Sequence, residues 1–184
     1  MSCLYLVRHA HSPRTPDEMR PLSDAGRADA ERVASILASV QPEAIYSSPY
    51  RRARQTVEPL AGLLGMPIQE VADLRERTLS SGEVEDFEAA VRDTWDDFAF
   101  THPGGESSAA AQRRVVDIHL ELACRHPVRP IVVATHGNLL ALLMNHYDRS
   151  VGFDSWKALS LPDIYRIDLA TTADVKFERV WGCD

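Results

Sequence analysis

Residues 3–9 read CLYLVRH and residues 130–136 read PIVVATH, so two short apolar runs each end in a histidine. The run at 130–135 is almost continuously apolar, which is typical of a central parallel strand covered on both faces. In open α/β sheets, ligands bind beyond the carboxyl ends of the strands. The pattern therefore predicts that His9 and His136, far apart in the chain, share one site.

Strand and helix patterns alternate along the rest of the chain. We expect helices at residues 24–39, about 50–65, 83–99, 106–125 and 138–146, and further strands at 44–46, 68–71, 164–169 and 175–181, with a polar turn at 171–174. Pro59 lies inside the second helix and is expected to kink it or to end its regular part. The alternation predicts an α/β fold, a three-layer α/β/α sandwich with a mostly parallel sheet.

Composition limits the classes of function. The chain has 184 residues, of which 45% are hydrophobic and 26% charged, as expected for one globular domain. Its net charge of −7 disfavours general binding of nucleic acid or of anionic membranes. No apolar stretch approaches the roughly 18 residues of a membrane span, and no signal peptide is evident. Cys3, Cys124 and Cys183 form no disulfide or metal-ligand pattern, which favours a cytoplasmic location.

Positive charge gathers near the end of the first strand. Arg8 precedes His9, and residues 51–54, which begin the second expected helix, read RRAR. Arginine matches phosphate oxygens through its planar, forked donors. Two histidines and several arginines in a net-acidic protein therefore indicate a local oxyanion pocket.

A series of motifs resembles, in order, those of the histidine phosphatase superfamily, also called phosphoglycerate mutase-like. They are LVRHA at 6–10, RPLS at 20–23, YSSPYRRARQT at 46–56, PGGES at 103–107 and THGN at 135–138. With SLPD at 160–163, the resemblance covers nearly the whole chain. It implies the phosphoglycerate mutase-like α/β fold.

The resemblance also implies roles for five residues. His9 would be the nucleophile that becomes phosphohistidine, and Arg8, Arg52 and His136 would bind the phosphoryl oxygens. Arg52 is selected from its cluster because the family's arginine directly precedes an Ala-x-x-Thr element. Glu76 would protonate the leaving oxygen. We expect a neutral His9, a protonated His136, and a helix N-terminus after His136 whose free amides favour an anion.

The chain departs from the family pattern at several positions. The Gly-x-x-x-Gly element that follows the family's Glu begins late and lacks its second glycine, so Glu83 competes with Glu76 for the role of acid. Ala10 replaces the usual glycine, His11 stands where Glu or Gln is commoner, and Thr15 stands where many relatives have Asn.

Two other classes of function are compatible with parts of the sequence. His9 and His11 form a His-x-His pair, and two histidines at positions i and i+2 of a strand share a face and can ligate zinc. A phosphoprotein-binding module with an inactive site is another class, although every expected catalytic residue type is present.

The sequence thus predicts a phosphomonoester hydrolase that acts on small phosphorylated metabolites without a metal or other cofactor. A phosphoglycerate mutase and a protein phosphohistidine phosphatase are the nearest alternatives. Cofactor-dependent mutases of the family are typically longer, which favours a phosphatase. We expect one domain, in which residues 77–105 form a small helical insertion over the site. If they do, the acidic stretch 83–97 would disfavour substrates with several negative charges.

Overall fold

A computed structural model describes residues 3–15, 18–168 and 175–182. Within these ranges the strands form one sheet in the order β3-β2-β4-β1-β5-β6. They are β1 (Cys3–Arg8), β2 (Ala44–Ser47), β3 (Ile68–Glu70), β4 (Ile131–Thr135), β5 (Asp163–Asp168) and β6 (Lys176–Arg179). The first four strands are parallel, and β5 and β6 pair antiparallel. The expected mostly parallel sheet is therefore confirmed, while the polar turn at 171–174 lies outside the described residues.

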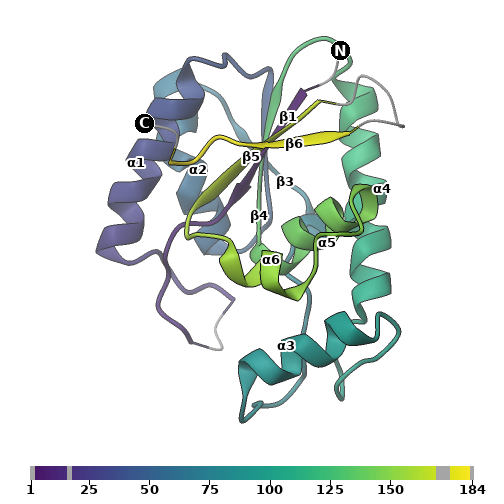
Figure 1. Cartoon of the computed structure of the whole chain (residues 1–184). Coiled ribbons are helices and arrows are strands. Elements are labelled where there is room, and N and C mark those ends of the chain that lie inside the picture. Colours follow the sequence, from purple (N-terminus) through teal and green to yellow (C-terminus); the bar gives the residue numbers. More distant parts are fainter. Residues whose placement is uncertain (1–2, 16–17, 169–174, 183–184) are drawn as a thin grey trace.

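Helices cover both faces of this sheet (Figure 1). One face carries α1 (Asp24–Ala38) and α2 (Arg51–Leu64), and the other carries α4 (Ser108–Arg125) and α5 (Gly137–Tyr147). Side chains of β1 alternate between the two layers, because Leu4 and Leu6 pack on the side of α4 and α5 and Val7 packs on the side of α1 and α2. The three-layer sandwich is therefore confirmed.

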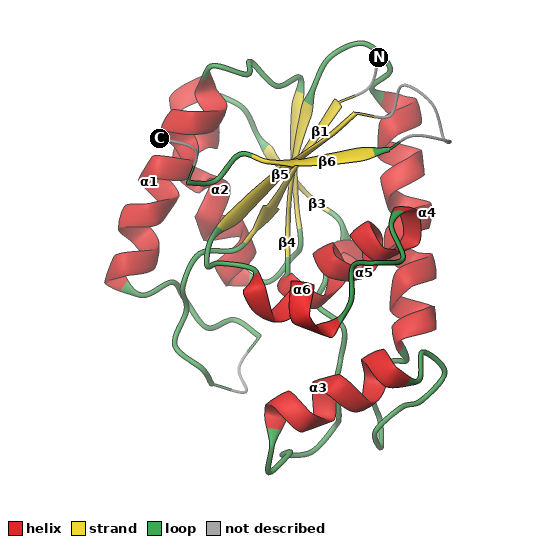
Figure 2. Ribbon diagram, in the orientation of Figure 1, coloured by secondary structure: helices red, strands yellow, loops and turns green. Residues whose placement is uncertain are grey.

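Three shorter helices complete the described fold. They are the 3₁₀ helix η1 (Ala72–Leu74), α3 (Phe87–Asp96) and α6 (Phe153–Ala158). Figure 2 shows α3 below the sheet, apart from the two helical layers. The sequence did not predict η1 or α6, because three or six residues are too few to display a helical period.

Capping residues shorten two of the predicted helices. Of the helix expected at 83–99, only Phe87–Asp96 (α3) is helical. Asp86 acts as its N-cap, because its side chain accepts a hydrogen bond from the amide of Ala89 (3.0 Å). Ser107 caps α4 in the same way through the amide of Ala110 (3.1 Å), so Glu106 lies before that helix.

Pro59 does not end α2, contrary to one of the two outcomes expected for it. The helix continues to Leu64 and closes at Gly65, which adopts a left-handed conformation with φ 63°. Val57 and Leu60, on either side of the proline, are fully buried. The stabilisation from their packing against the sheet offsets the loss of the backbone hydrogen bond that a proline removes from a helix.

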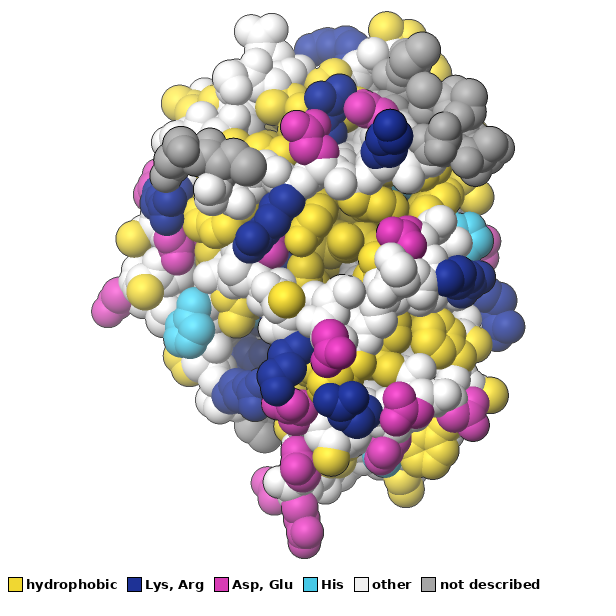
Figure 3. All heavy atoms as spheres, viewed as in Figure 1, with side chains coloured by type: hydrophobic (Ala, Val, Ile, Leu, Met, Phe, Trp, Pro, Cys, Tyr) yellow, Lys and Arg dark blue, Asp and Glu magenta, His cyan; other side chains and the backbone are white. Residues whose placement is uncertain are grey.

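The surface carries both signs of charge, and Figure 3 shows acidic side chains gathered around the lower end, where α3 lies. No helix among the described residues is long and apolar enough to cross a membrane.

Candidate active site

The two strand-end histidines lie together at the carboxyl edge of the sheet. β1 and β4 are neighbours, with Arg8 in register with Thr135, and the His9 amide donates to the Thr135 carbonyl (3.0 Å). The imidazole rings of His9 and His136 are 5.2 Å apart, centroid to centroid. Adjacent parallel strands thus bring the two residues into one site, as the strand pattern predicts.

The imidazole of His9 is held in one tautomer. Its Nδ1 lies 2.7 Å from the Ala10 carbonyl oxygen, to which only a protonated nitrogen can donate. Its Nε2 accepts a hydrogen bond from Arg52 Nε (3.2 Å) and therefore carries the lone pair. Burial lowers the pKa of His9 to about 3, and the charges of Arg52 and Arg8 act in the same direction. His9 is therefore a neutral imidazole whose Nε2 carries the lone pair and is held by Arg52.

His136 is also neutral, in contrast to the protonated form expected from the sequence. It is fully buried, and its Nε2 lies 2.8 Å from Ser48 Oγ. Burial lowers the pKa of His136 well below its usual range, and His9 and Arg52 lower it further. The sequence could not reveal this, because the pattern of a strand end does not specify how deeply the ring is buried.

Arg52 is the arginine of the 51–54 cluster that reaches the histidines. Its side chain is buried beside His9, and its guanidinium carbon lies 4.8 Å from the centre of the Tyr50 ring. Burial lowers the pKa of Arg52 to about 10, so it stays charged at neutral pH. Arg51 is exposed, and Arg54 forms ion pairs elsewhere on α2 and β3.

Arg8 lies across the start of α5. Its Nη1 donates to the carbonyls of Leu159 (2.6 Å) and Ser160 (3.3 Å). A Cβ atom added at Gly137 would approach the guanidinium carbon of Arg8 to 2.9 Å. The glycine of the THGN motif is therefore required for space rather than for an unusual backbone conformation.

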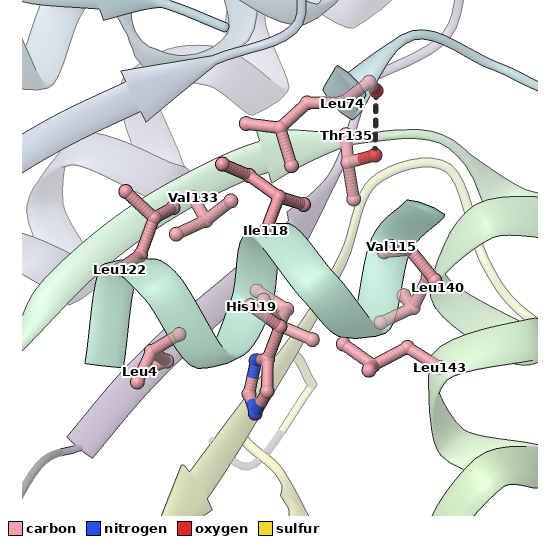
Figure 4. A pocket seen from close by; sticks show the side chains of 11 residues that line it. Leu4, Leu74, Val115, Ile118, His119, Leu122, Val133, Thr135, Leu140 and Leu143 are labelled. Carbon is pink, nitrogen blue, oxygen red and sulfur yellow. Dashed lines mark hydrogen bonds between the residues drawn. The ribbon is translucent and has the colours of Figure 1, made fainter. Parts of the chain in front are cut away.

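Glu76 reaches the site because its segment is fastened to the end of β4. Thr135 Oγ1 donates to the Leu74 carbonyl (2.9 Å), a contact that Figure 4 also shows. The Glu76 carboxylate accepts hydrogen bonds from the amides of Arg77 (2.9 Å), Asn138 (3.2 Å) and Leu139 (3.3 Å). Two of the amides at the N-terminus of α5 are thus occupied by the protein's own carboxylate, contrary to the expectation that they are free for a bound anion.

A cavity of about 370 Å³ opens in front of Arg8, His9, Arg52 and Glu76, whereas the fully buried His136 lies behind its wall. The sequence reading missed further residues that line it, among them Arg14, Glu18, Tyr50, Arg77 and Trp156. Tyr50 and Arg20, which also lines it, belonged to recognised motifs, whereas Arg14, Glu18, Arg77 and Trp156 carry no local sequence signal. Glu83, the competitor of Glu76, is exposed and does not line the cavity.

His9 and His11 do not share a strand face, so that part of the zinc hypothesis is wrong. β1 ends at Arg8, and the alternation of side chains ends with it. His11 is exposed, and its Nδ1 lies 2.8 Å from Ser23 Oγ at the start of α1. His9 Nε2 instead faces the guanidinium of Arg52, a cation that would repel a metal ion at that position.

The comparisons with known proteins identify the class. The family model of the histidine phosphatase superfamily (branch 1) matches residues 4–178. The chain therefore belongs to this superfamily, as its motifs indicated. Solved structures agree in fold: mycobacterial glucosyl-3-phosphoglycerate phosphatase superposes with a TM-score of 0.78 at 23% identity over 97% of this chain and 96% of its own. Bacillus stearothermophilus YhfR gives 0.79 at 24% identity over 98% and 96%.

Two relatives resemble the chain in sequence. Glucosyl-3-phosphoglycerate phosphatase of Mycolicibacterium vanbaalenii is 34% identical over 136 residues, 66% of this chain and 60% of the relative. A candidate phosphoserine phosphatase 2 of Hydrogenobacter thermophilus is 31% identical over 162 residues, 78% of this chain and 77% of the relative. The chain thus spans about 60% of the length of the mycobacterial enzymes it matches.

Proposed function

We propose that this protein hydrolyses phosphomonoesters of small metabolites through a phosphohistidine formed at His9, without a metal or other cofactor. The observation that carries the proposal is the state of His9, a buried neutral imidazole whose Nε2 lone pair faces a cavity lined by arginines. Similarity to relatives named for glucosyl-3-phosphoglycerate and phosphoserine supports a small phosphorylated substrate. A cytoplasmic location stays a prediction from the cysteine usage.

The first step transfers the phosphoryl group to the protein. The Nε2 lone pair of His9 forms a bond to phosphorus, and the bond from phosphorus to the alcohol oxygen breaks. A proton from the Glu76 carboxyl passes to that oxygen, so the alcohol leaves neutral. Arg8 and Arg52 neutralise the negative charge on the phosphoryl oxygens throughout.

The second step returns the protein to its starting state. Water attacks the phosphorus while the Glu76 carboxylate takes up one of its protons. The bond between nitrogen and phosphorus breaks, the electron pair returns to His9 Nε2, and inorganic phosphate is released. His136 assists both steps, because an anion bound beside it raises its pKa and lets it donate to a phosphoryl oxygen.

We further propose that the chain is one domain in which residues 77–105 cover the cavity. Support comes from residues 77–80 and Phe87, which line the cavity. Partners other than the substrate are not part of the proposal.

The test is hydrolysis of an aryl phosphate in EDTA by the wild type and by two histidine variants. We expect wild-type activity to survive the chelator, His9→Ala to lose at least about 10⁴-fold in kcat, and His11→Ala to stay near wild type. The wild type should also gain the mass of one phosphoryl group when quenched during turnover.

Other outcomes identify other functions. Activity that EDTA abolishes and zinc restores, lost equally in both variants, would overturn the mechanism in favour of a zinc hydrolase. Conversion of a phosphoglycerate to its isomer without release of phosphate would identify a mutase.

A further inference from the structure

The SLPD stretch at 160–163 is a recognised motif to which the proposed mechanism gives no role. It ends in Asp163, which begins β5 and is fully buried. β5 pairs antiparallel with β1, and Asp163 lies in register with Arg8. A buried carboxylate is costly unless it is paired and hydrogen-bonded, so its place opposite an arginine of the site requires a physical reason.

The carboxylate of Asp163 fastens the loop that precedes β5. Its Oδ2 accepts a hydrogen bond from the Ser160 amide (3.0 Å), and its Oδ1 accepts one from the Ile164 amide (3.1 Å). Arg179 of β6 binds both oxygens, through Nε at 2.8 Å and Nη2 at 3.0 Å. The same Nη2 donates to Ser160 Oγ (2.8 Å). Asp163 and Arg179 therefore hold the backbone of Ser160 in one position.

This loop, residues 159–162, in turn holds Arg8. Nη1 of Arg8 donates to the carbonyls of Leu159 (2.6 Å) and Ser160 (3.3 Å). The guanidinium also packs against the start of α5, where a Cβ atom at Gly137 would approach Nε to 2.9 Å. Among the described residues, the loop supplies the hydrogen bonds of the Arg8 side chain, so its orientation depends on the loop.

The loop holds Arg8 without neutralising it. Backbone carbonyls are uncharged acceptors, whereas a carboxylate in contact with Arg8 would compete with a phosphoryl group for its charge. Within the described ranges, Asp163 forms its ion pair with Arg179 and not with Arg8. Burial lowers the pKa of Arg8, and the negative charges of Glu76 and Asp163 oppose that shift. Asp163 thus favours the charged guanidinium without contacting it.

We propose that Asp163 is a positioning residue, which acts through the loop 159–162 to hold the Arg8 guanidinium where it binds the phosphoryl oxygens. The inference rests on the proposed function, in which Arg8 binds the phosphoryl group, and it adds a residue that the mechanism does not use. A guanidinium that is already held loses less side-chain freedom when a ligand binds. Loosening the loop should therefore weaken the binding of an oxyanion.

The experiment is an NMR titration with inorganic phosphate, which measures affinity without turnover and whose amide spectrum reports whether each variant is folded. Asp163→Asn keeps the size of the side chain but lacks the charge and one acceptor oxygen. In a chain that retains Arg8, we expect this change to raise the Kd for phosphate about tenfold. In the Arg8→Met background the same change should raise Kd less than about twofold, because Asp163 acts through Arg8.

A matched control lies at the other end of the same strand. Asp168 forms an ion pair with Arg166 (2.9 Å) and lies in register with Cys3 rather than Arg8. Asp168→Asn should leave the Kd for phosphate unchanged in both backgrounds.

A second variant loosens the loop from its solvent side. Arg179 is exposed, so Arg179→Gln removes the partner of Asp163 with little disturbance of the core. We expect a rise in Kd of about threefold, which should also disappear in the Arg8→Met background. This variant decides the question if Asp163→Asn does not fold.

Equal rises in Kd with and without Arg8 would overturn the inference, because Asp163 would then act on the fold or on the whole site. So would an unchanged Kd in Asp163→Asn, or a wild type that does not bind phosphate. Hydrolysis of an aryl phosphate by the wild type is measured beside the titrations. A wild type that binds phosphate but hydrolyses nothing would overturn the proposed function, while the Kd values would still decide the role of Asp163.

Discussion

His9 and His136 at the strand ends, and His119 in the layer between the sheet and α4, are all buried histidines with different surroundings. Each ring at the strand ends has at least one hydrogen-bond partner. His119 lies among leucine and valine side chains (Figure 4), and neither of its ring nitrogens has a partner among the described residues. Burial, together with the charge of nearby His146, lowers the pKa of His119 to about 4.

The difference teaches that a low pKa alone does not identify a functional histidine. Burial is the largest cause of the shift in all three residues. The strand-end pair combines that shift with nearby arginines, and His9 adds a fixed tautomer and an open cavity. The predictions below test whether the strand-end histidines determine activity while His119 affects only stability.

The largest expected effect is a difference in activity between a variant of His136 and a variant of His119. His136→Ala should lower kcat about 10²- to 10³-fold on an aryl phosphate, because a donor to the phosphoryl oxygens is lost. His119→Leu should stay within about twofold of wild type, since leucine suits its apolar surroundings. Equal losses of kcat in both variants would show that the strand-end site and the surroundings of His119 do not differ in this way.

The second prediction compares two carboxylates, Glu76 in the cavity wall and the exposed Glu83. Glu76→Gln should lower kcat about 10²-fold or more on a substrate with a poor leaving group, because glutamine cannot donate the proton. Glu83→Gln, an exposed counterpart, should remain near wild type. The reverse result would assign the acid role to Glu83.

A third prediction concerns stability in acid. A histidine with a pKa of 6.5 when unfolded and about 4 when folded prefers to be neutral in the fold. Its stabilising contribution is therefore complete above about pH 6.5 and is lost as the pH falls towards 4. Between about pH 7.5 and pH 5 the wild type should lose about 2 kcal/mol more in free energy of unfolding than His119→Leu does. Denaturation by urea at both pH values measures this, and parallel losses would contradict it.

The smallest effect is a change in an NMR titration. None of the three imidazoles should titrate between about pH 8 and pH 5.5, because their pKa values lie below that range. Inorganic phosphate should raise the pKa of His9 or His136, since an anion favours the charged ring, and should leave His119 unchanged. A response of His119 equal to theirs would show that the regions are not separate.

Much of the inner site could be predicted from the sequence. The two strand-end patterns alone bring His9 and His136 together, and the family motifs add Arg8, Arg52 and Glu76. These residues follow short local patterns, so their placement depends mainly on where a strand ends.

The remaining features depend on tertiary contacts. Two of the amides that hold Glu76 belong to α5, more than 60 residues away, and the contact of Thr135 with Leu74 brings the two segments together. Arg77 stands in a charged stretch that resembles an ordinary exposed segment, yet it is buried. The neutral state of His136 follows from a depth of burial that no local pattern encodes.

The hydrogen bond from the His9 amide to the Thr135 carbonyl has a mechanical consequence. It continues the pairing of β1 with β4 by one residue, so the alignment of two apolar strands sets the position of the nucleophile. A slip of one residue would displace His9 by about 3.3 Å and turn Leu4 and Leu6 towards the wrong layer. The register of the sheet thus sets the position of the reacting imidazole. Substitutions deep in the core, remote from any substrate, can therefore lower activity by shifting that register.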